Sequence, residues 1–206
     1  MTARPDSTWS VPDGRHAVAL VLVDMIKAFF DPRGEFYYPA ASEAAAGAGR
    51  LLEAARAGGR LVVHAHEAHR PGLADLEGTK LPVHTVAGTL DAEFADGFEP
   101  AKGEIAIAKR RYSAFFGTDL ALLLHEQGVR RIGIAGVKTN VCIRATVQDA
   151  FAHGFEPILA RGAVNSNRPH LHEATLEDVE RYFGSVVPLA EAERLLRGDE
   201  GERVDG

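Results

Sequence analysis

The stretch RIGIAGVKTNVCIRATVQDAFAHG, residues 131–154, decides the fold because it places the only cysteine of the chain between a strand and a helix. Residues 132–137 form a short, nearly unbroken apolar run, which is typical of a strand buried on both faces. Gly136 breaks this run where the backbone must turn, so the strand is predicted to end just after it. Thr139 and Asn140 follow, and both are good helix-capping residues.

A helix is predicted after this turn, because apolar residues recur at the spacing of one buried helical face: Ile143, Val147, Ala150 and Phe151. Gly154 is predicted to end it. Cys142 therefore lies in the first turn, where free backbone N–H groups and the positive end of the helix dipole favour a thiolate over a thiol. A lone cysteine is also compatible with a small buried apolar side chain. Its position just beyond the carboxyl end of a strand, where open α/β sheets bind ligands, favours a nucleophile.

Apolar runs and helical periodicity alternate along the rest of the chain. Strands are predicted at residues 17–23, 60–67, 104–108, 132–137, 156–159 and 185–187. Helices are predicted at residues 40–57, 119–127, 169–183 and 190–196, besides the one that follows the cysteine. This alternation indicates an α/β fold, a doubly wound, Rossmann-like and mostly parallel six-stranded sheet with helices on both faces.

The chain is predicted to hold one domain, residues 16–197, between two tails. Residues 1–15 are polar and contain Pro and Gly, which favours an N-terminal arm, and residues 198–206 read as an acidic, flexible tail. Residues 69–100 show no sustained periodicity. A loop of this length in a compact domain is usually functional or disordered.

Composition and charge narrow the function. With 206 residues, 46% of them hydrophobic, the chain can form one substantial core. The net charge of −6, with no basic cluster longer than residues 109–111, argues against nucleic acid and membrane partners and favours a small-molecule substrate. One cysteine cannot form an internal disulfide, and the polar N-terminus lacks the apolar core of a signal peptide, so we expect a cytoplasmic protein.

Three polar side chains stand at the ends of apolar strands: Asp24 after VLV, Lys109 after IAIA, and Cys142 just beyond GIAGV. With the phrases KRRYSAFFGTDL and GVKTNVCIRATVQDAFAHG, this pattern closely resembles the isochorismatase-like superfamily of cysteine hydrolases. That superfamily includes nicotinamidases and the N-carbamoylsarcosine, ureidoacrylate and biuret amidohydrolases. The resemblance extends over about residues 19–187.

The resemblance implies a catalytic triad of Asp24, Lys109 and Cys142, with a cis peptide between Val137 and Lys138. It also implies that the backbone N–H groups of Lys138 and Cys142 form an oxyanion hole. The chemistry is then attack of the Cys142 thiolate on an amide or ureido carbonyl, through a thioester intermediate.

Departures from the family pattern bear on the substrate. Many nicotinamidases read D-x-Q-x-D-F at the first strand, whereas residues 24–29 read DMIKAF, so the Gln and the second Asp are absent. True isochorismatases lack the nucleophilic cysteine, which argues against vinyl-ether hydrolysis. The substrate pocket is predicted to have walls from five residues: Phe29, Ala68, Tyr112, Phe115 and Val141.

A metal site is a further implication of the resemblance. HAHEAHRPG and LPVHTVAGT look like the two metal-binding phrases of nicotinamidases, so Glu67, His69 and His84 would bind a divalent ion such as zinc. The E-x-H-R-P form is also similar to the ureido-hydrolysing branch, where these residues need not hold metal, and the cysteine chemistry itself requires no cofactor. His64 and His66 alternate on a strand, which favours a packing role.

Two functional hypotheses follow. The first is an amidohydrolase of a small amide or ureido compound, with nicotinamide favoured by PVHTVAGT and ureido acids favoured by EAHRP. The second is a catalytically idle member that serves as a binding or assembly subunit. From the resemblance alone, we expect a homo-oligomer, either a dimer or a tetramer.

Overall fold

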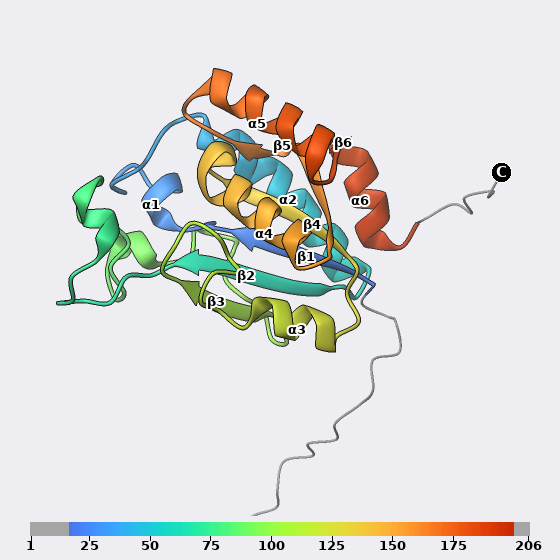
Figure 1. Ribbon diagram of the computed structural model, residues 1–206, viewed down its shortest axis with the longest axis horizontal. Helices are drawn as coiled ribbons and strands as arrows, with labels where there is room; N and C mark the ends of the chain where they lie inside the picture. The colour runs from blue at the N-terminus through green and yellow to red at the C-terminus, as the bar shows by residue number, and fades with distance from the viewer. Residues whose placement is uncertain (1–16, 200–206) are drawn as a thin grey trace, which may run out of the picture.

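Six parallel strands form one sheet in the order β3-β2-β1-β4-β5-β6 (Figure 1). The computed structural model describes residues 17–199. The strands are β1 (Val18–Val23), β2 (Leu61–Glu67), β3 (Ile105–Lys109), β4 (Arg131–Val137), β5 (Glu156–Asn165) and β6 (Ser185–Pro188). All five strand pairs are parallel, which confirms the predicted doubly wound α/β fold.

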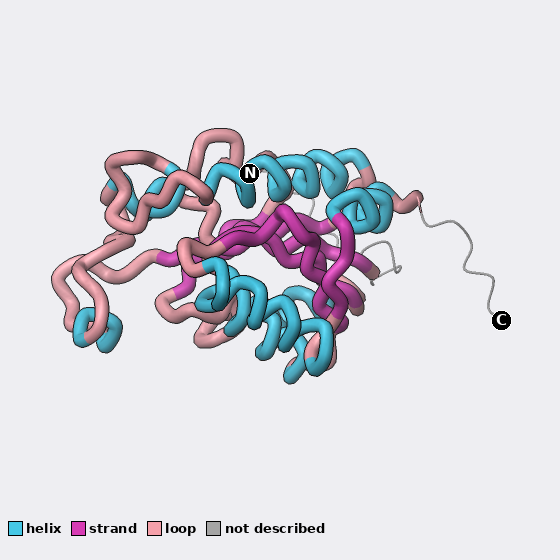
Figure 2. Tube along the Cα trace, turned by 90° about the horizontal axis from the view of Figure 1, so that it is seen from above, coloured by secondary structure: helices cyan, strands magenta, loops and turns pink. Residues whose placement is uncertain are grey.

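Helices cover both faces of the sheet, and Figure 2 shows the three layers edge-on. One face carries α2 (Ala41–Ala57) and α6 (Leu189–Arg197). The other carries α3 (Leu120–Glu126), α4 (Arg144–Ala152) and α5 (Pro169–Tyr182). Because each layer of helices buries one side of the sheet, the central strands are buried on both faces, as their unbroken apolar runs predict.

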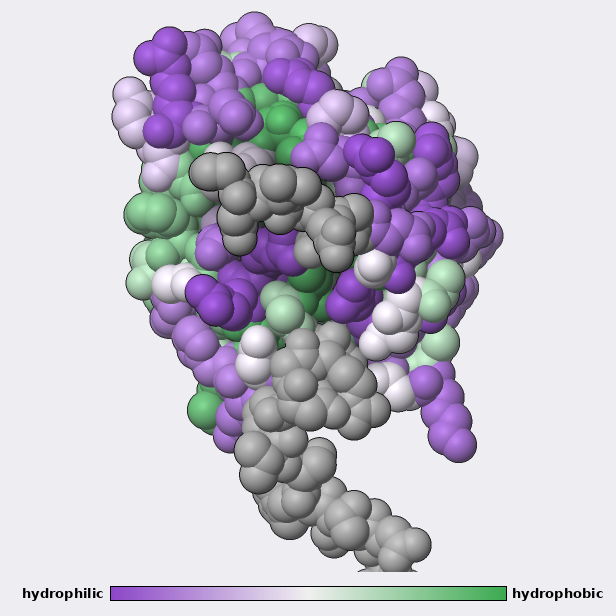
Figure 3. Space-filling view, turned by 90° about the vertical axis from the view of Figure 1, so that its right-hand side faces the viewer, coloured by the Kyte–Doolittle hydropathy of each residue, from purple (hydrophilic) through white to green (hydrophobic). Residues whose placement is uncertain are grey.

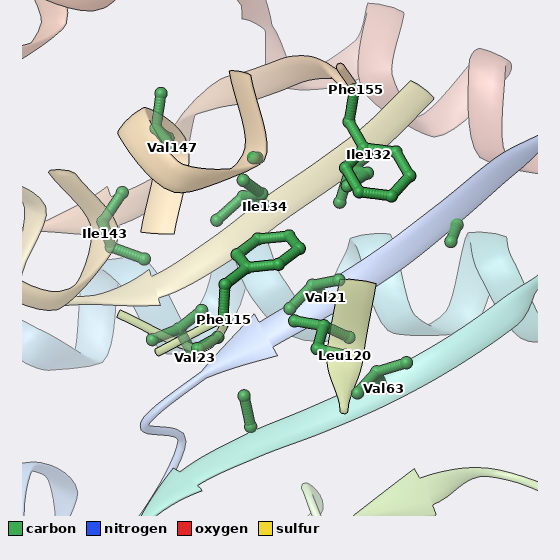
Figure 4. Close-up of a cluster of buried hydrophobic side chains, with 14 of the residues drawn as sticks. Val21, Val23, Val63, Phe115, Leu120, Ile132, Ile134, Ile143, Val147 and Phe155 are labelled. Atoms are coloured by element: carbon green, nitrogen blue, oxygen red, sulfur yellow. The ribbon is translucent and has the colours of Figure 1, made fainter. Parts of the chain in front are cut away.

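Strand β1 shows how the two faces divide the core. Its alternate side chains point to opposite sides, so Leu20 and Leu22 pack under α2 and α6 while Val21 and Val23 pack under α3 and α4. In Figure 4, Val21 and Ile134 from the sheet lie in one cluster with Val147 from α4. The end of the molecule where the strands begin, seen in Figure 3, carries largely hydrophilic side chains.

Most predicted elements are confirmed to within two residues, but one strand is longer than predicted and some short elements were not predicted. Strand β5 continues to Asn165 instead of ending at residue 159, across a register shift between Ile134 and Gly136 of β4. A four-residue helix, α1 (Lys27–Phe30), is too short to give a periodic signal. The predicted loop contains two 3₁₀ turns, η1 (Leu76–Thr79) and η2 (Leu90–Ala92).

Strand β4 ends at Val137, as predicted, and Gly136 is the residue just before that end. Gly136 has a φ of 124°, in the region that favours glycine. A Cβ atom at this position would collide with the carbonyl oxygen of Val23 on β1. The missing side chain therefore permits close approach of β4 to β1, next to the residues that follow both strands.

The predicted N-terminal arm and most of the acidic tail, residues 198–206, lie outside the described residues, so both stay predictions, as does the single-domain boundary at residues 16–197. Within residues 17–199, none of the helices is both long and apolar enough to cross a membrane.

Candidate active site

The carboxyl ends of the strands bring Asp24, Lys109 and Cys142 together. Asp24 directly follows β1, and Lys109 is the last residue of β3. Cys142 lies in a π-helical turn, η3 (Thr139–Ile143), between β4 and α4. Since β2 separates β3 from β1, the long Lys109 side chain bridges the interval to Asp24. Asp24 and Lys109 have no exposed surface, and Cys142 is 4% exposed.

Asp24 is held by contacts on both carboxylate oxygens. Its Oδ2 lies 2.8 Å from Nζ of Lys109, and its Oδ1 accepts a hydrogen bond of 2.8 Å from the backbone N–H of Glu67. Nζ of Lys109 also donates to the carbonyl oxygen of Arg111 at 3.2 Å. The same carboxyl group and the thiol of Cys142 influence each other's pKa. A carboxylate, an ammonium and a thiol thus form one buried cluster.

Burial is the largest influence on the pKa of the Cys142 thiol. It raises the pKa of Cys142 well above the ordinary value, and the positive charge of Lys109 opposes this only in part. Cys142 lies in the π-helical turn that precedes α4 and not in the first turn of α4 itself, which corrects its predicted position. Burial therefore acts against the thiolate that a helix end was expected to favour. A base must remove the proton.

The ion pair of Asp24 and Lys109 can supply the base that removes the proton of Cys142. Burial raises the pKa of Asp24, Lys109 opposes this, and the charge of Glu67 adds to it. Burial alone lowers the pKa of Lys109, but its interactions with Asp24, Cys142 and Glu67 outweigh this effect and raise the pKa overall. Lys109 therefore stays a cation, and Asp24 is a stronger base than an ordinary aspartate.

The turn that carries Cys142 is anchored by side chains from distant segments. The peptide between Val137 and Lys138 is cis. The hydroxyl of Thr139 lies 2.8 Å from Nδ1 of His172 on α5, and Oδ1 of Asn140 accepts a 2.6 Å hydrogen bond from the hydroxyl of Ser166. Neither residue caps the following helix, which corrects the expectation.

Cys142 opens onto a cavity of about 160 Å³. Its lining comes from α1, β2, the loops and the cysteine turn, and consists of Phe29, Phe36, Glu67, Leu81, His84, Tyr112, Lys138, Val141 and Cys142. Three of the five predicted wall residues, Phe29, Tyr112 and Val141, are among them.

The other two predicted wall residues lie elsewhere. Phe115 packs in the hydrophobic core, with its ring centroid 5.9 Å from that of Phe155. Ala68 donates its backbone N–H to the carbonyl oxygen of Lys109 and does not line the cavity. Position in a family phrase indicates that a residue is near the site but not which way its side chain points.

Beside this cavity, four acidic and imidazole side chains converge. The ligand atoms of Glu67, His69, Glu77 and His84 all lie within 4.8 Å of one another, and all four residues are buried. Nε2 of His84 is 3.5 Å from Oε2 of Glu67 and 3.6 Å from Oε2 of Glu77. The structure adds Glu77 to the three predicted candidates. It sits on turn η1 of the long loop, where no periodic or spacing signal identifies it.

The cluster fits a divalent metal ion. Oε1 of Glu67, both carboxylate oxygens of Glu77, and Nε2 of His69 and His84 are buried without a hydrogen-bond partner. The Nδ1 atoms are occupied, at 3.0 Å from Oδ2 of Asp75 for His69 and at 2.7 Å from the carbonyl oxygen of Pro82 for His84. Second-shell contacts of this kind orient Nε2 toward a metal, and two nitrogen and two carboxylate donors suit zinc.

The two histidines of β2, His64 and His66, are not part of this cluster. Nε2 of His64 lies 2.8 Å from Oε2 of Glu104, and the ring of His66 packs edge-on against Phe94 at 4.8 Å between centroids. Both contacts agree with the packing role expected for them.

Comparison with known proteins places these features in a family. The Isochorismatase domain family matches residues 18–191. Maleamate amidohydrolase from Pseudomonas putida is 38% identical over 184 residues, which cover 87% of this chain and 86% of that protein. N-carbamoylsarcosine amidase from an Arthrobacter species is 33% identical over 176 residues, covering 82% and 67%. The crystal structure of the pyrazinamidase of Pyrococcus horikoshii in complex with zinc has a TM-score of 0.77 at 32% identity, covering 84% and 99%. The two sequence relatives are named for the cleavage of C–N bonds.

Proposed function

This chain belongs to the isochorismatase domain family, and from that premise we propose that it is an amidohydrolase acting on a small amide or ureido substrate. The proposed reaction cleaves a C–N bond through a thioester on Cys142. The observation that carries this proposal is the buried ion pair of Asp24 and Lys109, 2.8 Å apart, at the same sheet edge as Cys142, which lies in the wall of a cavity.

The first half of the reaction is acylation. Asp24 takes the proton of Cys142, and the thiolate attacks the substrate carbonyl carbon to form a tetrahedral oxyanion. The backbone N–H groups of Lys138 and Cys142 hold that oxyanion, and each such donor contributes about 3 kcal/mol in other enzymes. Asp24 then gives the proton to the departing nitrogen as the C–N bond breaks, which leaves the acyl group on sulfur.

The second half is hydrolysis. Asp24 removes a proton from a water molecule, the water oxygen attacks the thioester carbonyl, and the C–S bond breaks to release the carboxylic acid. The thiolate of Cys142 recovers its proton. Lys109 stays charged throughout, and its role is to hold the carboxylate of Asp24 and to offset the negative charge that forms on sulfur.

Glu67, His69, Glu77 and His84 would hold a divalent ion such as zinc. A bound ion would supply a Lewis acid at the cavity wall, able to fix a polar group of the substrate or a water molecule. Glu67 and His84 line the cavity themselves, so this cluster lies next to the proposed site of the substrate.

An ammonia-release screen tests the proposal. The substrates are maleamate, nicotinamide, pyrazinamide, ureidoacrylate, N-carbamoyl amino acids and biuret, and the control variant is Cys142→Ala. We expect the parent protein to cleave at least one of them and the variant to cleave none. Equal rates for both would remove Cys142 as the nucleophile, and a parent protein that cleaves none would favour the idle binding subunit.

A further inference from the structure

Lys138 places a positive charge in the wall of the cavity that also contains Cys142. Its Nζ lies over three aromatic rings, at 5.6 Å from the centroid of Phe29, 5.1 Å from Phe36 and 5.8 Å from Tyr38. Among residues 17–199, no carboxylate forms an ion pair with this ammonium group. Cation–π contacts stabilise a desolvated ammonium, so the rings hold the charge in position without neutralising it.

A second cation lies close enough to act on the first. Burial lowers the pKa of Lys138, Cys142 opposes this, and the positive charge of Arg168 lowers it further. Arg168 is exposed just before α5, beside the segment that anchors the cysteine turn. The two cations repel each other, and an anion bound by Lys138 would relieve that repulsion.

The other cavity walls restrict what can fill it. Apolar side chains such as Leu81 and Val141 supply much of the lining. The volume of about 160 Å³ lies below the roughly 300–1,000 Å³ typical of sites for drug-sized ligands, so the substrate is small. A cationic substrate finds the aromatic faces already covered by the ammonium group of Lys138.

We propose that Lys138 is a specificity residue that pairs with a carboxylate of the substrate, and that the substrates are small monoamides of dicarboxylic acids. This inference rests on the proposed function, which places the amide carbonyl at Cys142. Lys138 and Cys142 line the same cavity, so one short molecule can present an amide to the sulfur and a carboxylate to the ammonium group. No bond forms at Lys138, which acts by binding and orientation.

A matched pair of substrates tests the charge recognition. Succinamate carries a carboxylate where butyramide carries a methyl group. In Lys138→Met, which retains length and loses charge, we expect kcat/KM on succinamate to fall about 100-fold, chiefly through KM. Butyramide has no carboxylate for Lys138 to bind, so its loss should be much smaller, and the ratio of kcat/KM on succinamate to that on butyramide should fall. Lys102→Met, a change at an exposed lysine, should act like the parent protein. Equal losses on both substrates would overturn the inference.

Binding measurements separate this inference from the proposed function. Calorimetric titration with succinate and with the neutral succinamide should give tighter binding of succinate to the parent protein, and Lys138→Met should abolish that preference. Succinate binding that is unaffected by Lys138→Met, or absent from the parent protein, overturns the inference even if amides are hydrolysed. Charge-selective binding without hydrolysis of any amide would refute the proposed function and retain the role of Lys138.

Discussion

Asp24 is the residue on which the proposed chemistry depends, and it has an uncommon backbone conformation with a φ of 55°. Its backbone N–H donates to the carbonyl oxygen of Ala65, and its side chain accepts from the backbone N–H of Glu67. Both partners are on β2, the strand beside β1. The carboxylate is therefore aimed by the sheet itself, and Lys109 provides its counter-charge.

Removal of that counter-charge should cost stability as well as activity. Lys109→Met leaves Asp24 buried and unpaired, so we expect the free energy of unfolding to fall by about 3–5 kcal/mol and amide hydrolysis to be lost. Urea denaturation measures the first effect and ammonia release the second. The double variant Asp24→Asn/Lys109→Met should recover stability but not activity. A Lys109→Met protein as stable as the parent would contradict this account of the pair.

Sequence patterns identified the proposed catalytic residues but not the role of the Lys138 side chain. Asp24, Lys109 and Cys142 each stand at the end of an apolar run, and the resemblance to the isochorismatase-like superfamily predicted that they form a triad. Lys138 was expected only as a backbone donor, since nothing local indicates that its side chain meets three aromatic rings.

At the scale of elements, Glu104 joins helix α2 to strands β2 and β3. It accepts hydrogen bonds from Nε of Arg56 at 2.7 Å and from the backbone N–H of Ala101 at 2.8 Å, and it lies 2.8 Å from Nε2 of His64. The hydrogen bond from Arg56 is the main cause that lowers the pKa of Glu104 to about 2, while burial opposes it.

This junction predicts a pH dependence of stability. A carboxyl group whose pKa is lower in the folded state stabilises the fold above its unfolded pKa of 4.5, and this contribution is lost as the pH falls toward about 2. In acid unfolding monitored by circular dichroism, Glu104→Gln should therefore lose less stability than the parent protein between pH 4.5 and 2. Glu156→Gln, at an exposed position, is the matched control. The same acid dependence in Glu104→Gln and the parent protein would rule out this role.

At the scale of the whole molecule, the long loop after β2 completes the acidic and imidazole cluster, whose first residue comes from the sheet. Glu67 comes from the end of β2, whereas His69, Glu77 and His84 come from the segment that follows it. The segment is anchored to itself by hydrogen bonds between backbone groups of His69, Thr85 and Ala87. The loop therefore folds back and delivers distant side chains to one point.

Zinc binding at this cluster should stabilise the whole fold. Zinc at 100 times its Kd adds about 2.7 kcal/mol to the free energy of unfolding of a protein with one site, so the melting temperature should rise by several degrees. We expect Glu77→Gln to show a smaller rise and Glu156→Gln to match the parent protein. Differential scanning calorimetry with and without zinc measures both. Equal stabilisation of Glu77→Gln and the parent protein would show that Glu77 is no ligand.

The sequence by itself determined the order of strands and helices, the parallel sheet and the three polar residues at the strand ends. These depend on local periodicity and on neighbours in the chain. Only the tertiary structure decided that Phe115 faces the core, that Glu77 completes the acidic and imidazole cluster, and that burial raises the pKa of Cys142. Each of these depends on side-chain direction and on burial among residues far apart in the chain, which no local pattern encodes.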